Sequence, residues 1–211
     1  VFVANSHFVA ERIQRIYGRS AEVVYPMVDF DFFSHSISDA RGDGYLLAGQ
    51  LVSYKRPDIA LLACLKMNRK LKIVGSGEQI EHLRALAEGS PNIEFLGRVS
   101  NEDLRRAYTE ARALLFPGVE DLGIVPLEAQ AAGTPVIAYG VGGARETVVA
   151  GETGLFFRQQ SVDSLCEAME EFEAKRWKAE DCRENAARFS PAVFHRAFRA
   201  VIDGAMAQTP T

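Results

Sequence analysis

The feature of this sequence that most restricts its fold is a repeated order of three patterns. A short apolar run is followed by a turn with glycine or polar residues, and then by an amphipathic segment. This order is typical of parallel strands joined by crossover helices that cover both faces of a sheet. The sequence therefore predicts an α/β fold with a doubly wound, Rossmann-like parallel sheet. The expected strands are residues 23–25, 45–48, 71–74, 93–96, 113–116 and 136–138, and the expected helices are residues 57–67, 78–88, 101–110, 126–132 and 144–149.

The amino-terminal part departs from this alternation. Residues 1–18 begin with a strand-like run that has no evident upstream partner, and they continue into a helix capped at Asn5 or Ser6. Residues 29–44 are polar and rich in turn formers, which predicts the main loop or linker.

The carboxyl-terminal part also departs from it. Residues 161–207 have helical patterns without intervening strands, which predicts three helices. Ser161 is the expected cap of the first helix, and Pro191 is expected near the first position of the last one. The doubly wound sheet is therefore expected to carry added helices at its end.

Composition excludes several classes of protein. The 211 residues include 24 Lys and Arg against 28 Asp and Glu, and the absence of a long basic run argues against a nucleic-acid partner. No apolar run approaches the roughly 20 residues that span a bilayer, and no charged segment precedes an apolar one at the start. Cys64, Cys166 and Cys182 lack metal-ligand spacing, which predicts buried or free thiols in a reducing cytoplasm and no metal site.

Two cations stand where a helix is expected to begin. Lys55 and Arg56 directly precede Pro57, a favoured first helical residue, so they lie at the positive end of the helix dipole. A bound anion such as phosphate would explain this placement. The alternative is that both side chains reach into solvent or toward Asp58.

The stretch "EDLGIVPLE" places Glu120 and Glu128 on either side of an expected turn from strand to helix. If Pro126 is the first helical residue, Glu128 occupies the third position, where an acid is favourable. The capping box is nevertheless incomplete, because Val125 stands where serine or threonine is needed. For Glu120, the alternative is a solvated loop acid.

Taken together, these groups predict a site for a sugar nucleotide. Carboxylates accept hydrogen bonds from sugar hydroxyls, whereas backbone amides and lysine bind phosphate oxygens. The glycine turns "GSGEQ" at 75–79 and "GVGGARE" at 140–146 allow the backbone to approach a ligand or a neighbouring turn. A single GxG is weak evidence, because the third glycine of the dinucleotide fingerprint is missing.

The segment "VEDLGIVPLEAQAAGTPVIAYGVGGARETVVAGETGLFF" resembles the signature region of the retaining family 4 (group 1) glycosyltransferases of GT-B fold, in which two acids are separated by seven residues. Supporting matches are "ANSHFVAERI", "LVSYKRPDIAL", "LKIVGSGEQ" and "NIEFLGRVSNEDL". The resemblance implies a carboxyl-terminal, donor-binding lobe. It also implies that residues 1–20 are a remnant of a preceding acceptor-binding lobe, 21–190 the nucleotide-sugar-binding domain and 191–211 a final helix and tail.

The resemblance also implies roles for individual residues. Glu128 would hold the ribose hydroxyls, and Glu120 would hold a hydroxyl of the donor sugar. Lys55 would neutralise the leaving phosphate, and the family needs neither a metal nor another cofactor. The remaining donor contacts implied are the amides of Gly123, Ile124 and Val125 at the diphosphate, and Gly75, Arg98 and Val99 near the base.

Two positions depart from the family pattern. Gln50 stands where relatives commonly carry a second phosphate-binding arginine, and Leu122 stands where they commonly carry phenylalanine. Arg56 is a candidate to compensate for the missing arginine. None of the four histidines, His7, His35, His82 and His195, follows an expected sheet strand at the crevice, and none is assigned a catalytic role.

The motifs most resemble GDP-mannose-dependent mannosyltransferases of surface polysaccharide synthesis. The implied acceptor is a glycan or lipid-linked molecule bound by the preceding lobe, with peripheral contact of the whole enzyme to the cytoplasmic face of a membrane. The alternatives are a UDP-hexose-dependent transferase, a non-catalytic nucleotide-sugar-binding lobe and a sugar-nucleotide epimerase. A dehydrogenase is disfavoured by the incomplete glycine fingerprint. This chain alone is expected to bind donor without transferring sugar.

Overall fold

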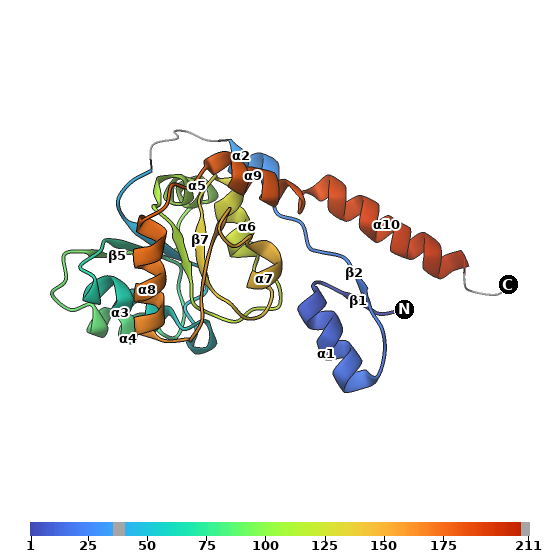
Figure 1. The fold of residues 1–211 in the computed structure, drawn as a ribbon, viewed down its shortest axis with the longest axis horizontal. Coiled ribbons are helices and arrows are strands. Elements are labelled where there is room, and N and C mark those ends of the chain that lie inside the picture. The colour runs from blue at the N-terminus through green and yellow to red at the C-terminus, as the bar shows by residue number, and fades with distance from the viewer. Residues whose placement is uncertain (36–40, 208–211) are drawn as a thin grey trace.

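A six-stranded parallel sheet forms the centre of the molecule (Figure 1). The computed structural model describes residues 1–35 and 41–207. The strand order in the sheet is β5-β4-β3-β6-β7-β8, and every neighbouring pair is parallel. The predicted α/β, Rossmann-like fold is thereby confirmed. The strands are β3 (Tyr45–Ala48), β4 (Leu71–Val74), β5 (Ile93–Gly97), β6 (Leu114–Phe116), β7 (Val136–Tyr139) and β8 (Gly154–Phe157).

Helices cover both faces of this sheet, and the core is divided accordingly. Successive side chains of a strand point to opposite faces, so Leu47 packs in one core cluster and Leu46 in the other. The first cluster lies under α3 (Pro57–Lys66), α4 (Ile80–Leu86) and α8 (Val162–Glu173). The second lies under α2 (Phe30–Ser34), α5 (Asn101–Glu110), α6 (Ile124–Ala131), α7 (Ala144–Thr147) and α9 (Ala179–Ala187).

Two strand predictions need correction. Residues 23–25 were expected in the main sheet, but β2 (Glu22–Val23) pairs instead with β1 (Val3–Ala4) in a separate two-stranded sheet. The run at 154–157 was not expected as a strand, yet β8 is the sheet edge beside β7. Both differences depend on pairing partners that are distant in sequence, which local apolar patterns do not reveal.

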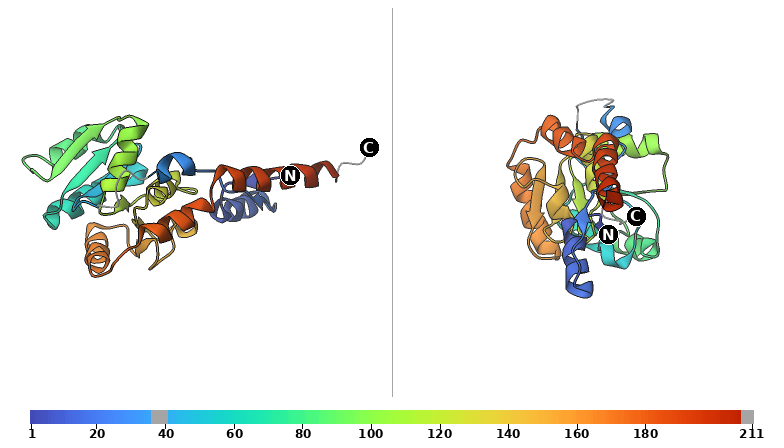
Figure 2. Two further views of the ribbon diagram at one scale, coloured as in Figure 1. Left: turned by 90° about the horizontal axis from the view of Figure 1, so that it is seen from above. Right: turned by 90° about the vertical axis from the view of Figure 1, so that its right-hand side faces the viewer.

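The helices at the two ends follow the predictions. Ser6 caps α1 (His7–Tyr17), and Ser161 caps α8. Pro191 is the first residue of α10 (Pro191–Ala207), which projects away from the sheet (Figure 2). Residues 29–44, expected as a loop, contain the short helix α2, while residues 36–40 of that loop lie outside the described part of the chain, as do residues 208–211 of the expected tail. No helix among the described residues is long and apolar enough to cross a membrane.

The unit formed by β1, α1 and β2 is fastened to the main domain through Glu146. The Glu146 carboxylate accepts hydrogen bonds from the amides of His7 and Phe8, at 2.8 and 2.9 Å, and from the Tyr25 hydroxyl at 2.8 Å. These amides lie in the first turn of α1, where no intrahelical partner exists. Burial, followed by the bond to Glu146, raises the pKa of Tyr25 to about 12. Glu146 on α7 therefore ties the amino-terminal unit to the main domain, together with an ion pair between Arg12 Nη2 and Asp121 Oδ2 at 2.9 Å.

Candidate functional site

The strand order reverses between β3 and β6, which defines where a ligand would bind. The chain adds β4 and β5 on one side of β3 and then crosses to β6 on the other side. In open α/β sheets, ligands bind beyond the carboxyl ends of the strands at such a switch point. A cavity of about 580 Å³ lies there, at the ends of β3, β4 and β5 and against α5 and α6. Its lining includes six residues expected at the donor site: Gln50, Gly75, Arg98, Val99, Val125 and Glu128.

Position 75, which lines this cavity, can be occupied only by glycine. Its φ angle is +127°, and a Cβ atom there would lie 1.8 Å from the carbonyl oxygen of Gly49. The two turns that follow β3 and β4 thus touch through their backbones, which only glycine permits. The glycine turn predicted from sequence forms part of the cavity wall.

Glu128 reaches the cavity from α6, but not from the expected helical position. The helix begins at Ile124, with Gly123 as its cap at φ 87°, so Glu128 is the fifth residue rather than the third. The expected start at Pro126 was wrong because the left-handed conformation of Gly123 turns the chain earlier, and proline is tolerated within a first helical turn. Glu128 therefore does not cap its own helix, and its carboxylate accepts from the Tyr108 hydroxyl at 2.8 Å.

The interactions of Glu128 within the protein do not fully offset the cost of burying its charged carboxylate. Burial raises the pKa of its carboxyl group, and the hydrogen bond from Tyr108 opposes that effect without cancelling it. At the start of the same helix, no hydrogen bond between described residues uses the amides of Gly123, Ile124 or Val125. A carboxylate and a set of free amides are thus available on adjacent turns of α6.

Lys55 and Glu120 form the second part of the site. Lys55 ends the short 3₁₀ helix Ser53–Lys55, and its Nζ lies 3.0 Å from Glu120 Oε1. Their side chains are 21% and 20% exposed, so the pair is largely shielded. Both residues line a small cavity together with Gln50, which also lines the larger one. Most of the predicted residues therefore fall into two adjacent groups that share Gln50, whereas Gly123 and Ile124 line neither cavity.

Arg56 does not join either group. Its Nη2 lies 2.8 Å from Asp58 Oδ2, as the alternative interpretation of the sequence held, and it lines neither of the two cavities. In this structure Arg56 is therefore not placed to substitute for the arginine that Gln50 replaces.

The glycine loop before α7 supports the Glu120 turn. Gly143 donates its amide hydrogen to the Glu120 carbonyl at 2.9 Å, and a Cβ atom on Gly143 would lie 2.2 Å from the Cα atom of Leu122. Of the two roles that the sequence left open for this loop, close packing on the neighbouring turn is the one seen. The loop fixes the backbone that carries Glu120.

Tyr108 is the site residue that sequence reasoning missed. It lines the larger cavity and is 1% exposed. On the inner face of an amphipathic helix, an aromatic residue has the pattern of an ordinary core residue, so no local signal marks it. Among the described residues, no group of three or more His, Cys, Asp or Glu side chains is arranged to hold a metal ion.

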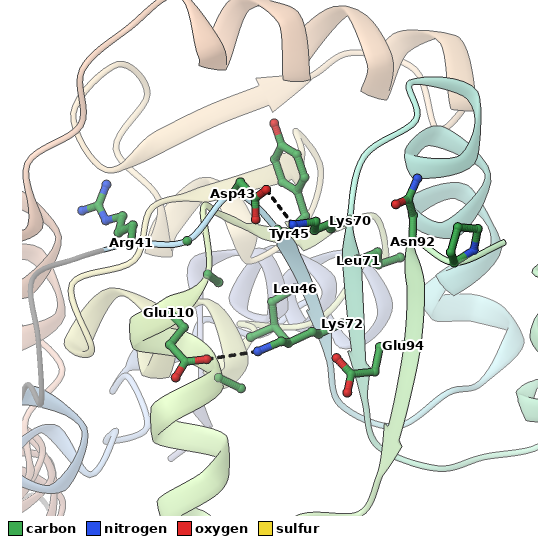
Figure 3. Close-up of a pocket in the computed structure, with 15 residues that line it drawn as sticks. Arg41, Asp43, Tyr45, Leu46, Lys70, Leu71, Lys72, Asn92, Glu94 and Glu110 are labelled. Atoms are coloured by element: carbon green, nitrogen blue, oxygen red, sulfur yellow. Dashed lines mark hydrogen bonds and ion pairs between the residues drawn. The ribbon is translucent and has the colours of Figure 1, made fainter.

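A second cavity, of about 430 Å³, lies at the opposite edge of the sheet (Figure 3). It is lined by the amino ends of β3, β4 and β5 and by the end of α5. Its lysines are already paired: Lys70 Nζ lies 2.9 Å from Asp43, and Lys72 Nζ lies 3.0 Å from Glu110. None of the residues expected to bind donor lines this cavity.

Comparison with known proteins agrees with the fold and identifies the family. The family described as glycosyl transferases group 1 matches residues 34–189. A GDP-mannose-dependent monoacylated α-(1-6)-phosphatidylinositol monomannoside mannosyltransferase of Corynebacterium glutamicum is 41% identical over 136 residues, covering 60% of this chain and 33% of the relative. The family match extends over more than half of the sequence, and the chain belongs to the group 1 glycosyltransferases, a family of enzymes that use nucleotide-sugar donors.

Solved structures of other glycosyltransferases share the fold. Sucrose-phosphate synthase from Thermosynechococcus elongatus superposes with a TM-score of 0.86 at 24% identity, over 98% of this chain and 58% of that one. Anabaena HepE in complex with UDP and glucose gives a TM-score of 0.77 at 18% identity, over 98% and 62%. The chain spans between 33% and 46% of the length of the curated relatives that it matches.

Proposed function

We propose that this chain is the donor-binding part of a retaining glycosyltransferase that uses GDP-mannose. The observation that carries the proposal is the cavity of about 580 Å³ at the switch point of the sheet, with the half-buried Glu128 in its lining. A nucleoside presents an apolar base and two ribose hydroxyls, and these hydroxyls donate to a carboxylate. GDP-mannose is favoured because the Corynebacterium glutamicum relative is named as dependent on it.

In this proposal the nucleoside occupies the larger cavity. The base lies against Gly75, Arg98 and Val99, which follow β4 and β5, and Glu128 accepts from the ribose hydroxyls. The diphosphate then extends toward Gln50, the residue shared with the smaller cavity.

The diphosphate is bound by the start of α6 and by Lys55. The amides of Gly123, Ile124 and Val125 have no partner among the described residues, and they lie at the positive end of the helix dipole. As the bond from sugar to diphosphate breaks, negative charge grows on the leaving phosphate. Lys55 Nζ and these amides stabilise that charge without a metal ion.

Glu120 has to exchange partners when donor binds. Its carboxylate is paired with Lys55, at 3.0 Å. The phosphate replaces Glu120 as a partner of Lys55, and a hydroxyl of the donor sugar replaces Lys55 as a partner of Glu120. The ion pair therefore holds both groups in place before binding, and it is exchanged for two contacts to the ligand.

The acceptor is proposed to be a glycan or a lipid-linked molecule bound by a further lobe, with peripheral contact of that whole enzyme to a membrane. Sugar transfer then needs both lobes, and the present chain binds donor without transferring sugar. Incubation of residues 1–211 with GDP-mannose and candidate acceptors tests this point, and sugar transfer by the chain alone would contradict it.

Calorimetry with GDP, UDP, GDP-mannose and UDP-glucose tests the donor. We expect the guanine nucleotides to bind more tightly than the uracil nucleotides. Glu128→Ala should weaken all four by about 10- to 100-fold, which is roughly 1–3 kcal/mol for a lost charged acceptor. Glu94→Ala, an exposed acid lining the other cavity, is the matched control and should leave each Kd unchanged.

The outcomes separate the candidates. Tighter binding of the uracil nucleotides supports the UDP-hexose-dependent transferase that the sequence left as an alternative. Unchanged affinity in Glu128→Ala overturns the ribose assignment. Failure of the wild-type chain to bind any of the four nucleotides overturns the proposed function.

A further inference from the structure

The Tyr108 side chain is held rigidly behind the donor cavity. It lies near the end of α5, and its ring meets Phe33 of α2 edge-on, with 5.8 Å between the ring centroids. Its backbone carbonyl accepts from Thr134 Oγ1 at 2.6 Å, which anchors this part of α5 beside the start of β7. The phenol oxygen is thereby directed at one acceptor, Glu128 Oε2, at 2.8 Å.

This bond occupies only one side of the Glu128 carboxylate. A carboxylate has two oxygens and accepts about four hydrogen bonds. No donor from the described residues reaches Glu128 Oε1. The terminal torsion of glutamate is broad, so an unanchored carboxylate would rotate. Because Tyr108 holds Oε2, the position of Oε1 is fixed as well.

We infer that Tyr108 is a positioning residue for ribose recognition: its phenol holds Glu128 Oε2 so that Oε1 is presented to the vicinal diol of a nucleotide in the cavity. This inference rests on the proposed function, and it assigns to α5 a role in binding that the family motif does not contain. Tyr108 acts through Glu128 and need not contact the ligand.

The electrostatics of the pair agree with this arrangement. Burial raises the pKa of Tyr108 well above its ordinary value, and the charge of Glu128 and the hydrogen bond raise it further, so the phenol remains a proton donor at neutral pH. Burial also raises the pKa of Glu128, whereas the bond from Tyr108 lowers it. Of the titratable groups that line the cavity with Glu128, Tyr108 comes from α5 and Arg98 follows β5. Removing the phenol should therefore raise the pKa of Glu128.

The chain contains a matched pair that serves as a control. Tyr45 is also 1% exposed and donates its hydroxyl to Glu173 Oε1 at 2.6 Å. This pair joins the amino end of β3 to the end of α8, and Glu173 lines neither part of the donor site. Tyr45→Phe removes an equivalent bond without touching the proposed ligand. Phe33→Leu is a second control, because it loosens the packing around Tyr108 but keeps the phenol.

The experiment is calorimetry with GDP and 2′,3′-dideoxy-GDP on the wild-type chain, Tyr108→Phe, Tyr45→Phe and Phe33→Leu between pH 5 and pH 8. We expect Tyr108→Phe to reduce the preference for GDP over the dideoxy nucleotide about 3- to 10-fold, the scale of one ordinary hydrogen bond, because Tyr108 acts only through Glu128. We also expect it to lose GDP affinity at a higher pH than wild type, because a protonated Glu128 is a weaker acceptor for the diol than the carboxylate. The two control variants should keep the wild-type preference and pH profile.

Each outcome has a definite meaning. An unchanged ribose preference and pH profile in Tyr108→Phe would overturn the inference while leaving the proposed function intact. Loss of preference in Phe33→Leu equal to that in Tyr108→Phe would assign the effect to packing, which also overturns it. If the wild-type chain binds GDP and dideoxy-GDP equally, the ribose assignment fails, and the inference fails with it.

Discussion

Two buried tyrosines donate hydrogen bonds to carboxylates at opposite edges of the sheet, and the pKa values of these two carboxyl groups are shifted in opposite directions. At Glu128 burial dominates and the pKa is raised. Glu173 is also subject to burial, but the hydrogen bonds from Arg112 and Tyr45 outweigh it and its pKa is lowered. The difference is the guanidinium of Arg112, whose Nε and Nη2 lie 3.2 and 2.8 Å from Glu173 Oε2.

The same contrast extends over both edges. At the amino edge Lys70, Lys72 and Glu173 each form an ion pair within the protein. At the carboxyl edge Glu128 has no cationic partner among the described residues, and the amides that start α6 are unused. Uncompensated polar groups cost stability, so a fold retains them where a ligand supplies the missing partners. Lys55 and Glu120 at the carboxyl edge are also paired, at 3.0 Å. The contrast therefore concerns Glu128 and the α6 amides, which the proposed function assigns to ligand binding.

The largest effect should come from Glu173→Gln. We expect a loss of about 2 kcal/mol in the free energy of unfolding at neutral pH, the scale of hydrogen bonds to a charged group. Because the pKa of Glu173 is lowered in the folded state, its contribution is present above the unfolded pKa and is lost as pH falls through the folded pKa. Chemical denaturation at neutral and acidic pH checks this, and nucleotide affinity should stay at the wild-type value.

Lys55→Ala should have the next largest effect, on nucleotide binding. We expect about 10-fold weaker binding of GDP, or roughly 1.4 kcal/mol, because a partly buried cation is lost from the diphosphate. Lys72→Ala, which also removes a paired lysine but at the amino edge, is the control in the same calorimetric titrations. Equal losses in both variants would erase the distinction between the two edges.

Glu128→Gln should stabilise the fold while weakening binding. Because the pKa of Glu128 is raised by folding, the charged form is disfavoured in the folded state, and this cost is felt as pH rises through the folded pKa. We expect a gain of about 1 kcal/mol at neutral pH that vanishes in acid. A loss of stability at neutral pH would show that Glu128, like Glu173, is a structural carboxylate.

The smallest expected effect is that of Gln50→Arg. This change restores the second cation at the position where the two parts of the site meet. We expect a several-fold gain in GDP affinity that diminishes as salt is added, because screening weakens exposed ion pairs. Gln50→Leu is the control, because it changes the side chain at this position without adding a positive charge. Unchanged affinity in Gln50→Arg would mean that the phosphates do not pass this residue.

Much of the fold could be read from local pattern. The apolar runs at 45–48 and 71–74 coincide with β3 and β4, and Ser161 and Pro191 lie where their capping and helix-starting preferences predict. The three cysteines are free and buried, as their spacing predicted. These features depend on interactions within a few residues, for which sequence is sufficient.

Features that depend on distant partners could not be read in this way. The pairing of β2 with β1 and the helix start at Ile124 differ from the local pattern. The ion pair of Lys55 with Glu120 and the bond of Tyr108 to Glu128 join residues 65 and 20 positions apart. The sequence around a glutamate does not indicate whether its carboxylate will be paired with a guanidinium, as Glu173 is, or with a phenol, as Glu128 is.

The sequence by itself determined the parallel sheet, the glycine turns and the family motif around Glu120 and Glu128, because these follow from periodicity and local chemistry. The tertiary structure decided which of the charged residues remain available. It paired Arg56 with Asp58 and Arg112 with Glu173, and within residues 1–35 and 41–207 it gave Glu128 only the phenol of Tyr108. The physical reason is that burial and hydrogen bonding set the energy of a charge, and both depend on side chains that only folding brings together.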